Sequence, residues 1–210
     1  MVHPFHSRLF YSLPMSSIFL TYDDGPNPSV TPPLLDLLDD LHATATFFVT
    51  GESLKTSASR EILRSILARG HTLGNHGLVH RRGTCPRFDI MRDEINDICG
   101  VDTRLIRAPY GSRRLLIRHL KENLDCVAIH WTTHFTDWQP VDLDGIGLRL
   151  PQLIGPGIIV LLHDGYVTGV SYKDRMQVLR LTQSICQFGE AKGIEFKGIA
   201  AHFPQYHQLK

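Results

Sequence analysis

Short apolar runs alternate along the chain with longer stretches in which apolar residues recur every three or four positions. The short runs are rich in β-branched and aromatic residues, which is typical of buried strands, whereas the longer spacing is typical of amphipathic helices. Strands are predicted over residues 18–22, 46–50, 71–74, 105–107, 126–131, 158–162 and 193–197. Helices are predicted over residues 31–41, 59–69, 88–98, 112–123, 143–154 and 173–188.

This strict alternation predicts an α/β fold, because helical crossovers join parallel strands. About seven strand–helix units in one short chain suit a small, incomplete barrel better than two domains. The sequence contains no repeat, low-complexity segment or linker. We therefore expect one domain over residues 18–210, preceded by an N-terminal extension over residues 1–17.

The composition is that of a globular protein, with 42% hydrophobic and 20% charged residues. Lysine and arginine number 22 against 21 acidic residues, a formal net charge of +1, which argues against nucleic-acid or anionic-membrane partners. No apolar stretch reaches the roughly 18 to 20 residues of a membrane-spanning helix, and the first thirty residues show no secretory signal. We expect a cytoplasmic protein, unless a leader has been removed. The sequence leaves the oligomeric state open.

Unusual polar residues follow most of the predicted strands at the point where each strand ends. In parallel α/β folds the carboxyl ends of the strands share one rim, which carries the chemistry. The segments that follow the strands are Asp23-Asp24-Gly25-Pro26, Asn75-His76-Gly77-Leu78-Val79-His80, Arg107-Ala108-Pro109-Tyr110-Gly111, Thr136-Asp137-Trp138 and His163-Asp164-Gly165.

His76 and His80 are spaced so that both imidazoles can face one metal ion on a single helical turn. With Asp24 they would complete a set of two histidines and one carboxylate, which is a standard catalytic zinc site. The alternative is that this spacing arose by chance and that both are ordinary surface or core histidines.

The remaining polar residues suggest acid–base roles beside such a site. Asp23 could accept a proton, although Asp-Asp-Gly-Pro is also a common turn sequence. Arg107 could keep that carboxylate ionised or form an ordinary salt bridge, and Tyr110 could offer its backbone N–H to an oxyanion. His163, with Asp137 as its partner, could be a general acid or a histidine that merely caps a buried strand.

Five segments in this order resemble the motifs of the polysaccharide deacetylase family, the NodB homology domain of carbohydrate esterase family four. They are Thr21-Tyr22-Asp23-Asp24-Gly25-Pro26, His76-Gly77-Leu78-Val79-His80, Arg107-Ala108-Pro109-Tyr110-Gly111, Thr136-Asp137-Trp138 and Leu161-Leu162-His163-Asp164. The resemblance covers roughly residues 18 to 200. It implies a distorted (β/α) barrel with seven or eight parallel strands.

The resemblance also implies a role for each matching residue. Asp24, His76 and His80 match the metal triad, which holds Zn²⁺ or another divalent ion such as Co²⁺. Asp23 matches the catalytic base and Arg107 the residue that supports it, while Tyr110 matches the backbone amide at the oxyanion. His163 matches the general acid and Asp137 the carboxylate that orients it. Trp138 and Leu161 match the apolar wall beside the acetyl methyl group.

Some positions depart from the family's usual pattern. His134 stands where an acid is usual, and Gly77 replaces a common Ser or Thr. Arg81 occupies a position where proline is frequent, and the stretch from His80 to Arg107 is shorter than usual. We expect these departures to affect the choice of substrate more than catalysis.

These features favour a metal-dependent hydrolase that removes N-acetyl groups from N-acetylglucosamine units of a chitooligosaccharide or related glycan. In this reading the chain is similar to the NodB-type chitooligosaccharide deacetylases. One alternative is an esterase that removes O-acetyl groups from a polysaccharide such as xylan, because the same residues would serve both reactions. Another is a catalytically silent sugar-binding homologue, which would lack a ligand, the base or the acid, whereas all of them are present here.

Overall fold

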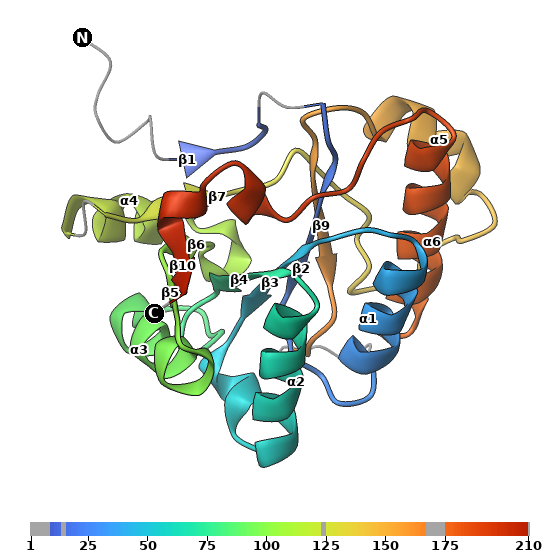
Figure 1. Ribbon diagram of the computed structural model, residues 1–210. Helices are drawn as coiled ribbons and strands as arrows, with labels where there is room; N and C mark the ends of the chain where they lie inside the picture. The colour runs from blue at the N-terminus through green and yellow to red at the C-terminus, as the bar shows by residue number, and fades with distance from the viewer. Residues whose placement is uncertain (1–8, 14–15, 123–124, 167–174, 210) are drawn as a thin grey trace, which may run out of the picture.

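The computed structural model describes residues 9–13, 16–122, 125–166 and 175–209. Its main sheet has eight strands, all paired in parallel, in the order β1-β7-β6-β4-β3-β2-β9-β8. The strands are β1 (Leu9–Phe10), β2 (Phe19–Asp23), β3 (Thr46–Val49), β4 (Thr72–Asn75), β6 (Leu105–Ile106), β7 (Val127–Ile129), β8 (Thr133–His134) and β9 (Ile159–His163). The sheet curls into an open barrel with β1 and β8 at its edges, which confirms the predicted fold class (Figure 1).

Helices cover the outside of this sheet (Figure 1). The α-helices are α1 (Thr31–Asp40), α2 (Ser57–Ala68), α3 (Phe88–Cys99), α4 (Arg113–Glu122), α5 (Ile146–Leu153) and α6 (Gln177–Glu190). The short 3-10 helices are η2 (Gly51–Leu54), η3 (Pro109–Gly111), η4 (Ile199–Ala201) and η5 (Pro204–Tyr206). A separate antiparallel pair joins β5 (Val101–Thr103) to β10 (His207–Leu209). In the helices of the described ranges, none combines the length and apolar character that crossing a membrane requires.

Alternation of side chains along the strands produces two apolar layers. Phe47 and Tyr22 stack at 5.0 Å in the layer between the sheet and the helices. The neighbouring residue Phe48 points the other way, into the barrel, where it packs with Phe19 and Ile159. Because this alternation continues to the strand ends, it sends Asp23 of β2 into the barrel as well.

The predicted strand over 193–197 is wrong. Only Phe196 forms a bridge, to Ile18, because Gly193 adopts a φ of +67° at the end of α6 and the chain turns into η4 after Gly198. The predicted helix over 173–188 begins later, at Gln177, and its first two residues lie outside the described residues. The predicted end of the 112–123 helix also falls on an undescribed residue.

Residues 9–13 of the predicted N-terminal extension contact the sheet. Leu9 pairs with Ala128 in β7, and Leu13 is buried inside the barrel, where its N–H donates to the Gly157 carbonyl at 2.9 Å. The boundary at residue 18 stays a prediction, but this part of the extension packs as part of the barrel.

Candidate active site

The register between β2 and β9 brings two predicted site residues together. Asp23 lies directly opposite His163, and Thr21 lies opposite Leu161. Residues two apart on a strand face the same side, so these four side chains share the inner face of the barrel near its carboxyl-end rim. The predicted base and the predicted acid therefore come from neighbouring strands that are 140 positions apart in the sequence.

Asp23 forms a buried ion pair with Arg107. The Arg107 Nη1 lies 2.7 Å from Asp23 Oδ1, and the guanidinium is entirely inaccessible to solvent. Burial opposes ionisation of Asp23, but Arg107 and His76 outweigh it and lower the pKa of this carboxyl below its ordinary value. Asp23 is therefore a carboxylate at neutral pH, ready to accept a proton.

Arg107 is held in place by groups around its whole guanidinium. Its Nη1 donates to Thr21 Oγ1 at 2.7 Å, its Nε to the Ile129 carbonyl at 3.1 Å and its Nη2 to the His130 carbonyl at 2.9 Å. Its face lies 4.1 Å from the centre of the Phe48 ring. A cation that uses four of its five N–H groups in this way has little freedom to leave Asp23, so the orientation of the carboxylate is fixed.

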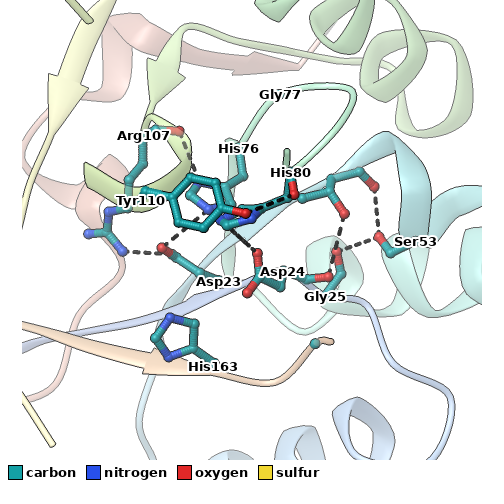
Figure 2. A network of polar contacts seen from close by, with 12 residues as sticks. Asp23, Asp24, Gly25, Ser53, His76, Gly77, His80, Arg107, Tyr110 and His163 are labelled. Carbon is teal, nitrogen blue, oxygen red and sulfur yellow. Dashed lines mark hydrogen bonds and ion pairs between the residues drawn. The ribbon is translucent and has the colours of Figure 1, made fainter. Parts of the chain in front are cut away.

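Asp24, His76 and His80 form a buried cluster of three ligand groups (Figure 2). Asp24 Oδ1 lies 3.5 Å from His76 Nε2 and 3.6 Å from His80 Nε2. Tetrahedral ligands about 2.1 Å from one ion lie roughly 3.4 Å from one another, which matches both distances. Asp24 Oδ1 is buried and has no hydrogen-bond partner among the described residues. The cluster therefore fits a divalent cation that takes nitrogen and oxygen ligands.

The backbone around this cluster sets the tautomer of His76 and places Asp24 in an uncommon conformation. His76 Nδ1 lies 2.9 Å from the Arg107 carbonyl oxygen. A carbonyl can only accept, so Nδ1 carries the proton and Nε2 is left with its lone pair toward Asp24. Asp24 itself adopts a φ of +73°, a conformation uncommon for a residue other than glycine and one that clusters at functional sites.

Asp137 binds His163 through both of its oxygens. Oδ1 lies 2.8 Å from His163 Nδ1, and Oδ2 accepts the His163 backbone N–H at 2.7 Å. Burial disfavours the charged imidazole, but the attraction of Asp137 more than offsets it and raises the pKa of His163 to about 9. His163 is therefore protonated at neutral pH, with Nε2 free to donate.

Two residues that the sequence reasoning missed hold Asp137 in place. The buried Arg175 donates to the carbonyls of Asp137, at 3.3 Å, and Gly165, at 2.8 Å. Gln177 donates to the same Asp137 carbonyl at 2.7 Å. Neither residue belongs to a recognisable motif, since both fall in a stretch whose apolar spacing indicated only a helix. Their burial and their contacts with Asp137, which the sequence does not show, are what identify them.

Tyr110 lies over the metal cluster. Its ring centre is 4.3 Å from that of His80, and its hydroxyl donates to the His80 carbonyl at 3.4 Å. Its φ is +56°, and the following Gly111 has a φ of +61°, so the chain makes a tight left-handed turn at the cavity wall. The proposed oxyanion role of the Tyr110 N–H stays a prediction.

One cavity of about 380 Å³ gathers these groups, which is within the range of small ligand sites. Eight of the ten predicted site residues line it, and the other two, Arg107 and Asp137, lie directly behind Asp23 and His163. Residues that line the cavity without having been predicted are Arg82, Gly111, Trp131 and Arg175.

The Trp138 ring contacts His163, the predicted general acid, and also His134, which stands where an acid is usual in the family pattern. It lies 5.3 Å from the His163 ring in an edge-on contact, and it stacks with the exposed His134 ring at 5.5 Å. Leu161 lines the same cavity and is almost fully buried. Together Trp138 and Leu161 form the apolar part of the wall beside His163.

Gly77, the other departure, is required by the local backbone. Its φ is +90°, and a side chain there would meet Pro86, whose carbonyl accepts the Leu78 N–H at 2.6 Å. The loop that carries His76 and His80 is thus closed against Pro86 at Gly77.

Comparisons with known proteins agree with one another and with the family resemblance of the sequence motifs. A family model described as polysaccharide deacetylase matches residues 11–129. A chitooligosaccharide deacetylase of Bradyrhizobium sp. is 32% identical over 206 residues, which cover 91% of this chain and 90% of the relative. Another, from Sinorhizobium fredii, is 35% identical over 157 residues, covering 71% of this chain and 72% of the relative.

The fold is similar to that of a solved peptidoglycan N-acetylglucosamine deacetylase in complex with 4-naphthalen-1-yl-N-oxidanyl-benzamide. The two chains align with a TM-score of 0.77 at 25% identity, over 92% of each.

Proposed function

Because this chain belongs to the polysaccharide deacetylase family, we propose that it removes N-acetyl groups from N-acetylglucosamine units of a chitooligosaccharide or related glycan by hydrolysis. One observation carries this proposal: a carboxylate held ionised by Arg107 and an imidazole held protonated by Asp137 face each other beside a three-ligand cluster. Hydrolysis of an amide needs a base for the water and an acid for the amine, and both are in place.

Asp24, His76 and His80 would hold a divalent cation in this site, since their ligand atoms converge and Asp24 Oδ1 is otherwise unpaired among the described residues. When bound, such an ion supplies Lewis-acid polarisation of a carbonyl and lowers the pKa of a water molecule toward neutrality. Zinc suits the two nitrogens and one oxygen, and Co²⁺ accepts the same ligands.

Asp23 accepts the proton of the attacking water, because its lowered pKa keeps it ionised and its Oδ2 faces the cluster, 3.6 Å from His76 Nε2. Arg107 stays paired with the other oxygen throughout. The Tyr110 N–H, on the opposite wall, hydrogen-bonds the oxyanion that forms when the carbonyl carbon becomes tetrahedral.

His163 donates a proton from Nε2 to the departing sugar nitrogen, which would otherwise be a poor leaving group. Asp137 fixes the ring so that Nδ1 keeps its own proton and Nε2 points into the cavity. Trp138 and Leu161 contact the methyl of the acetyl group. The products are acetate and a glucosamine unit that carries a free amine.

The test is acetate release from tetra-N-acetylchitotetraose by purified protein, before and after chelation and with zinc or cobalt restored. We expect chelation to abolish release, the metal to restore it, and Asp23→Asn to remove it. The exposed Asp144, which pairs only loosely with Arg180 at 3.4 Å, provides the control Asp144→Asn, expected to keep full activity. Tight metal binding without any release from the oligomer would refute the proposal.

Acetylated xylan belongs in the same assay. An alcohol leaves more easily than an amine, so the same residues would also hydrolyse an acetate ester. Release from xylan alone would replace the amide substrate by an ester. The absence of both metal binding and release would favour a sugar-binding protein without catalysis.

A further inference from the structure

A second cavity, of about 830 Å³, adjoins the catalytic cavity. It lies between residues 83–89, which precede and begin α3, and residues along the whole length of α4, and both helices lie on the same side of the molecule in Figure 1. Arg82 and Gly111 line the catalytic cavity, whereas the next residues along the chain, Gly83 and Ser112, line the second. The two cavities thus meet along the chain at Arg82–Gly83 and at Gly111–Ser112, and we call these four residues the shared wall.

Arginines dominate the charge of the second cavity. Arg87 and Arg118 line it but are already paired, with Asp89 at 3.0 Å and Glu122 at 3.4 Å respectively. Arg114 lines it too, and no acidic side chain in the described part of the chain pairs with it. Among the three arginines that line the cavity, Arg114 is thus the one without an ion pair in the described part of the chain.

The shared wall carries another unpaired cation. The Arg82 guanidinium lies 4.5 Å above the centre of the Tyr110 ring, and within the described ranges it forms no ion pair. An arginine on an aromatic face keeps its edge N–H groups free for another partner. The first turn of α4 also lacks an acidic residue, so nothing there offsets the positive end of this helix.

We propose that the second cavity binds a carboxylate or phosphate carried by the substrate glycan, with Arg114 as the donor inside the cavity and Arg82, which lines the neighbouring catalytic cavity, as a second donor at the shared wall. This rests on the proposed deacetylase function and narrows its substrate to an acidic glycan. The guanidinium fork matches the geometry of both oxyanions. A chain that places an N-acetylglucosamine unit beside Asp24 passes over the shared wall and brings its next units to Arg114.

The test compares N-acetylglucosamine oligomers of two to five units in three forms: neutral, with the reducing end oxidised to a carboxylate, and with a phosphate at the reducing end. We expect kcat/KM to be about tenfold higher for an acidic form of suitable length than for the neutral form at low salt, as one charge-assisted hydrogen bond would provide. The preference should shrink as the salt concentration rises.

Arg114→Gln should remove most of this preference, and Arg82→Gln should reduce it. The control is Arg180→Gln on α6, an exposed arginine outside both cavities, which should keep the preference in full. Circular dichroism establishes that each variant is folded. Acetate release from all forms at equal kcat/KM would overturn the inference and leave the deacetylase function standing.

Direct binding separates the two proposals. If no form releases acetate but calorimetry shows Arg114-dependent binding of the acidic oligomers, the anion site stands and the deacetylase function fails. Vesicles of phosphatidylserine and phosphatidylcholine test a lipid source of the anion. Arg114-dependent binding to these vesicles, without any preference among the oligomers, would overturn the inference in favour of a membrane surface.

Discussion

The carboxylate of Asp137 hydrogen-bonds both the ring and the backbone of His163, with one oxygen for each. The ring bond raises the pKa of the imidazole, and the backbone bond fixes the distance between the two residues. Charge and position of the proposed acid are therefore set by the same group, which is itself almost fully buried.

Asp137→Asn removes the charge while keeping the shape. Burial is then no longer offset by Asp137, so the pKa of His163 falls from about 9 to a lower value, and only Asp24 and Asp23 still raise it. We expect kcat at pH 8 to drop by about 10²- to 10⁴-fold, the usual contribution of a general acid, and the alkaline limb of the pH–rate profile to move from near 9 to lower pH. The profile of acetate release measures both. An unmoved alkaline limb would remove His163 from the acid role.

The same pair should make stability depend on pH. Since the folded-state pKa of His163 is raised, the stabilising contribution is complete below pH 6.5 and disappears as pH rises to about 9. Denaturation by urea at pH 6 and at pH 9.5 should therefore show a lower midpoint at the higher pH. In Asp137→Asn this difference should be smaller, and an equal difference in both proteins would contradict the assignment.

Arg107→Gln should lower the free energy of unfolding and also change the pH dependence of acetate release. Removing one member of a fully buried ion pair leaves Asp23 without its main counter-charge, which costs about 3–5 kcal/mol. Without Arg107 the burial of Asp23 raises the pKa of its carboxyl, so the acidic limb of the pH–rate profile moves to higher pH. Urea denaturation measures the loss. The exposed pair of Arg180 and Asp144 gives the matched comparison, where Arg180→Gln should cost less than about 1 kcal/mol.

Asp24→Ala should weaken zinc binding far more than the roughly 10- to 100-fold that changes to surrounding hydrogen bonds cause. The reason is that Asp24 provides the only oxygen of the cluster and lies within 3.6 Å of both imidazole nitrogens. Calorimetric titration with zinc on the metal-free protein measures the affinity. Asp142→Ala, at an exposed loop carboxylate that accepts the Gly145 N–H, is the control. Equal zinc affinity in both variants would exclude Asp24 as a ligand.

Gly77→Ser, which restores a residue common in the family, should be harmful here. The φ of +90° costs about 1–2 kcal/mol for a residue with a side chain, and contact with Pro86 adds to it. Gly70→Ser is the matched control, because Gly70 has a φ of +80° but open space around it. Thermal unfolding should show a larger fall for Gly77→Ser, accompanied by weaker zinc binding. Equal falls would mean that Pro86 plays no part.

Much of the site could be predicted because its residues lie in short motifs at the ends of strands. The alternation of strands and helices along the chain likewise allowed the α/β fold class to be predicted. Sequence does not reveal strand order, however, so the pairing of β2 with the distant β9, which places Asp23 opposite His163, comes only from the structure.

Other features escaped because their cause is tertiary. Arg175 has the sequence context of a helix, and only its burial behind Asp137 gives it a role. The strands β5 and β10 have three residues each, too few to show alternation, and they exist because they pair with each other. The stretch 193–197 has strand-like composition, but Gly193 turns the chain and leaves one bridge.

The position of β1 has a consequence for how this protein is made. Leu9 pairs with Ala128, so an early strand waits for a partner that is translated 119 residues later. At about 5–20 residues per second, a ribosome takes roughly 6 to 24 s to supply that partner. Until then Leu9 and Phe10 lack their strand partners, and the partners of Ser12 and Leu13, which are Ile158 and Gly157, are made later still. This edge of the sheet thus closes only after residues 128 and 129 have been made, and the pairings of β9 with β2 and β8 become possible later still, when residues 159–163 follow.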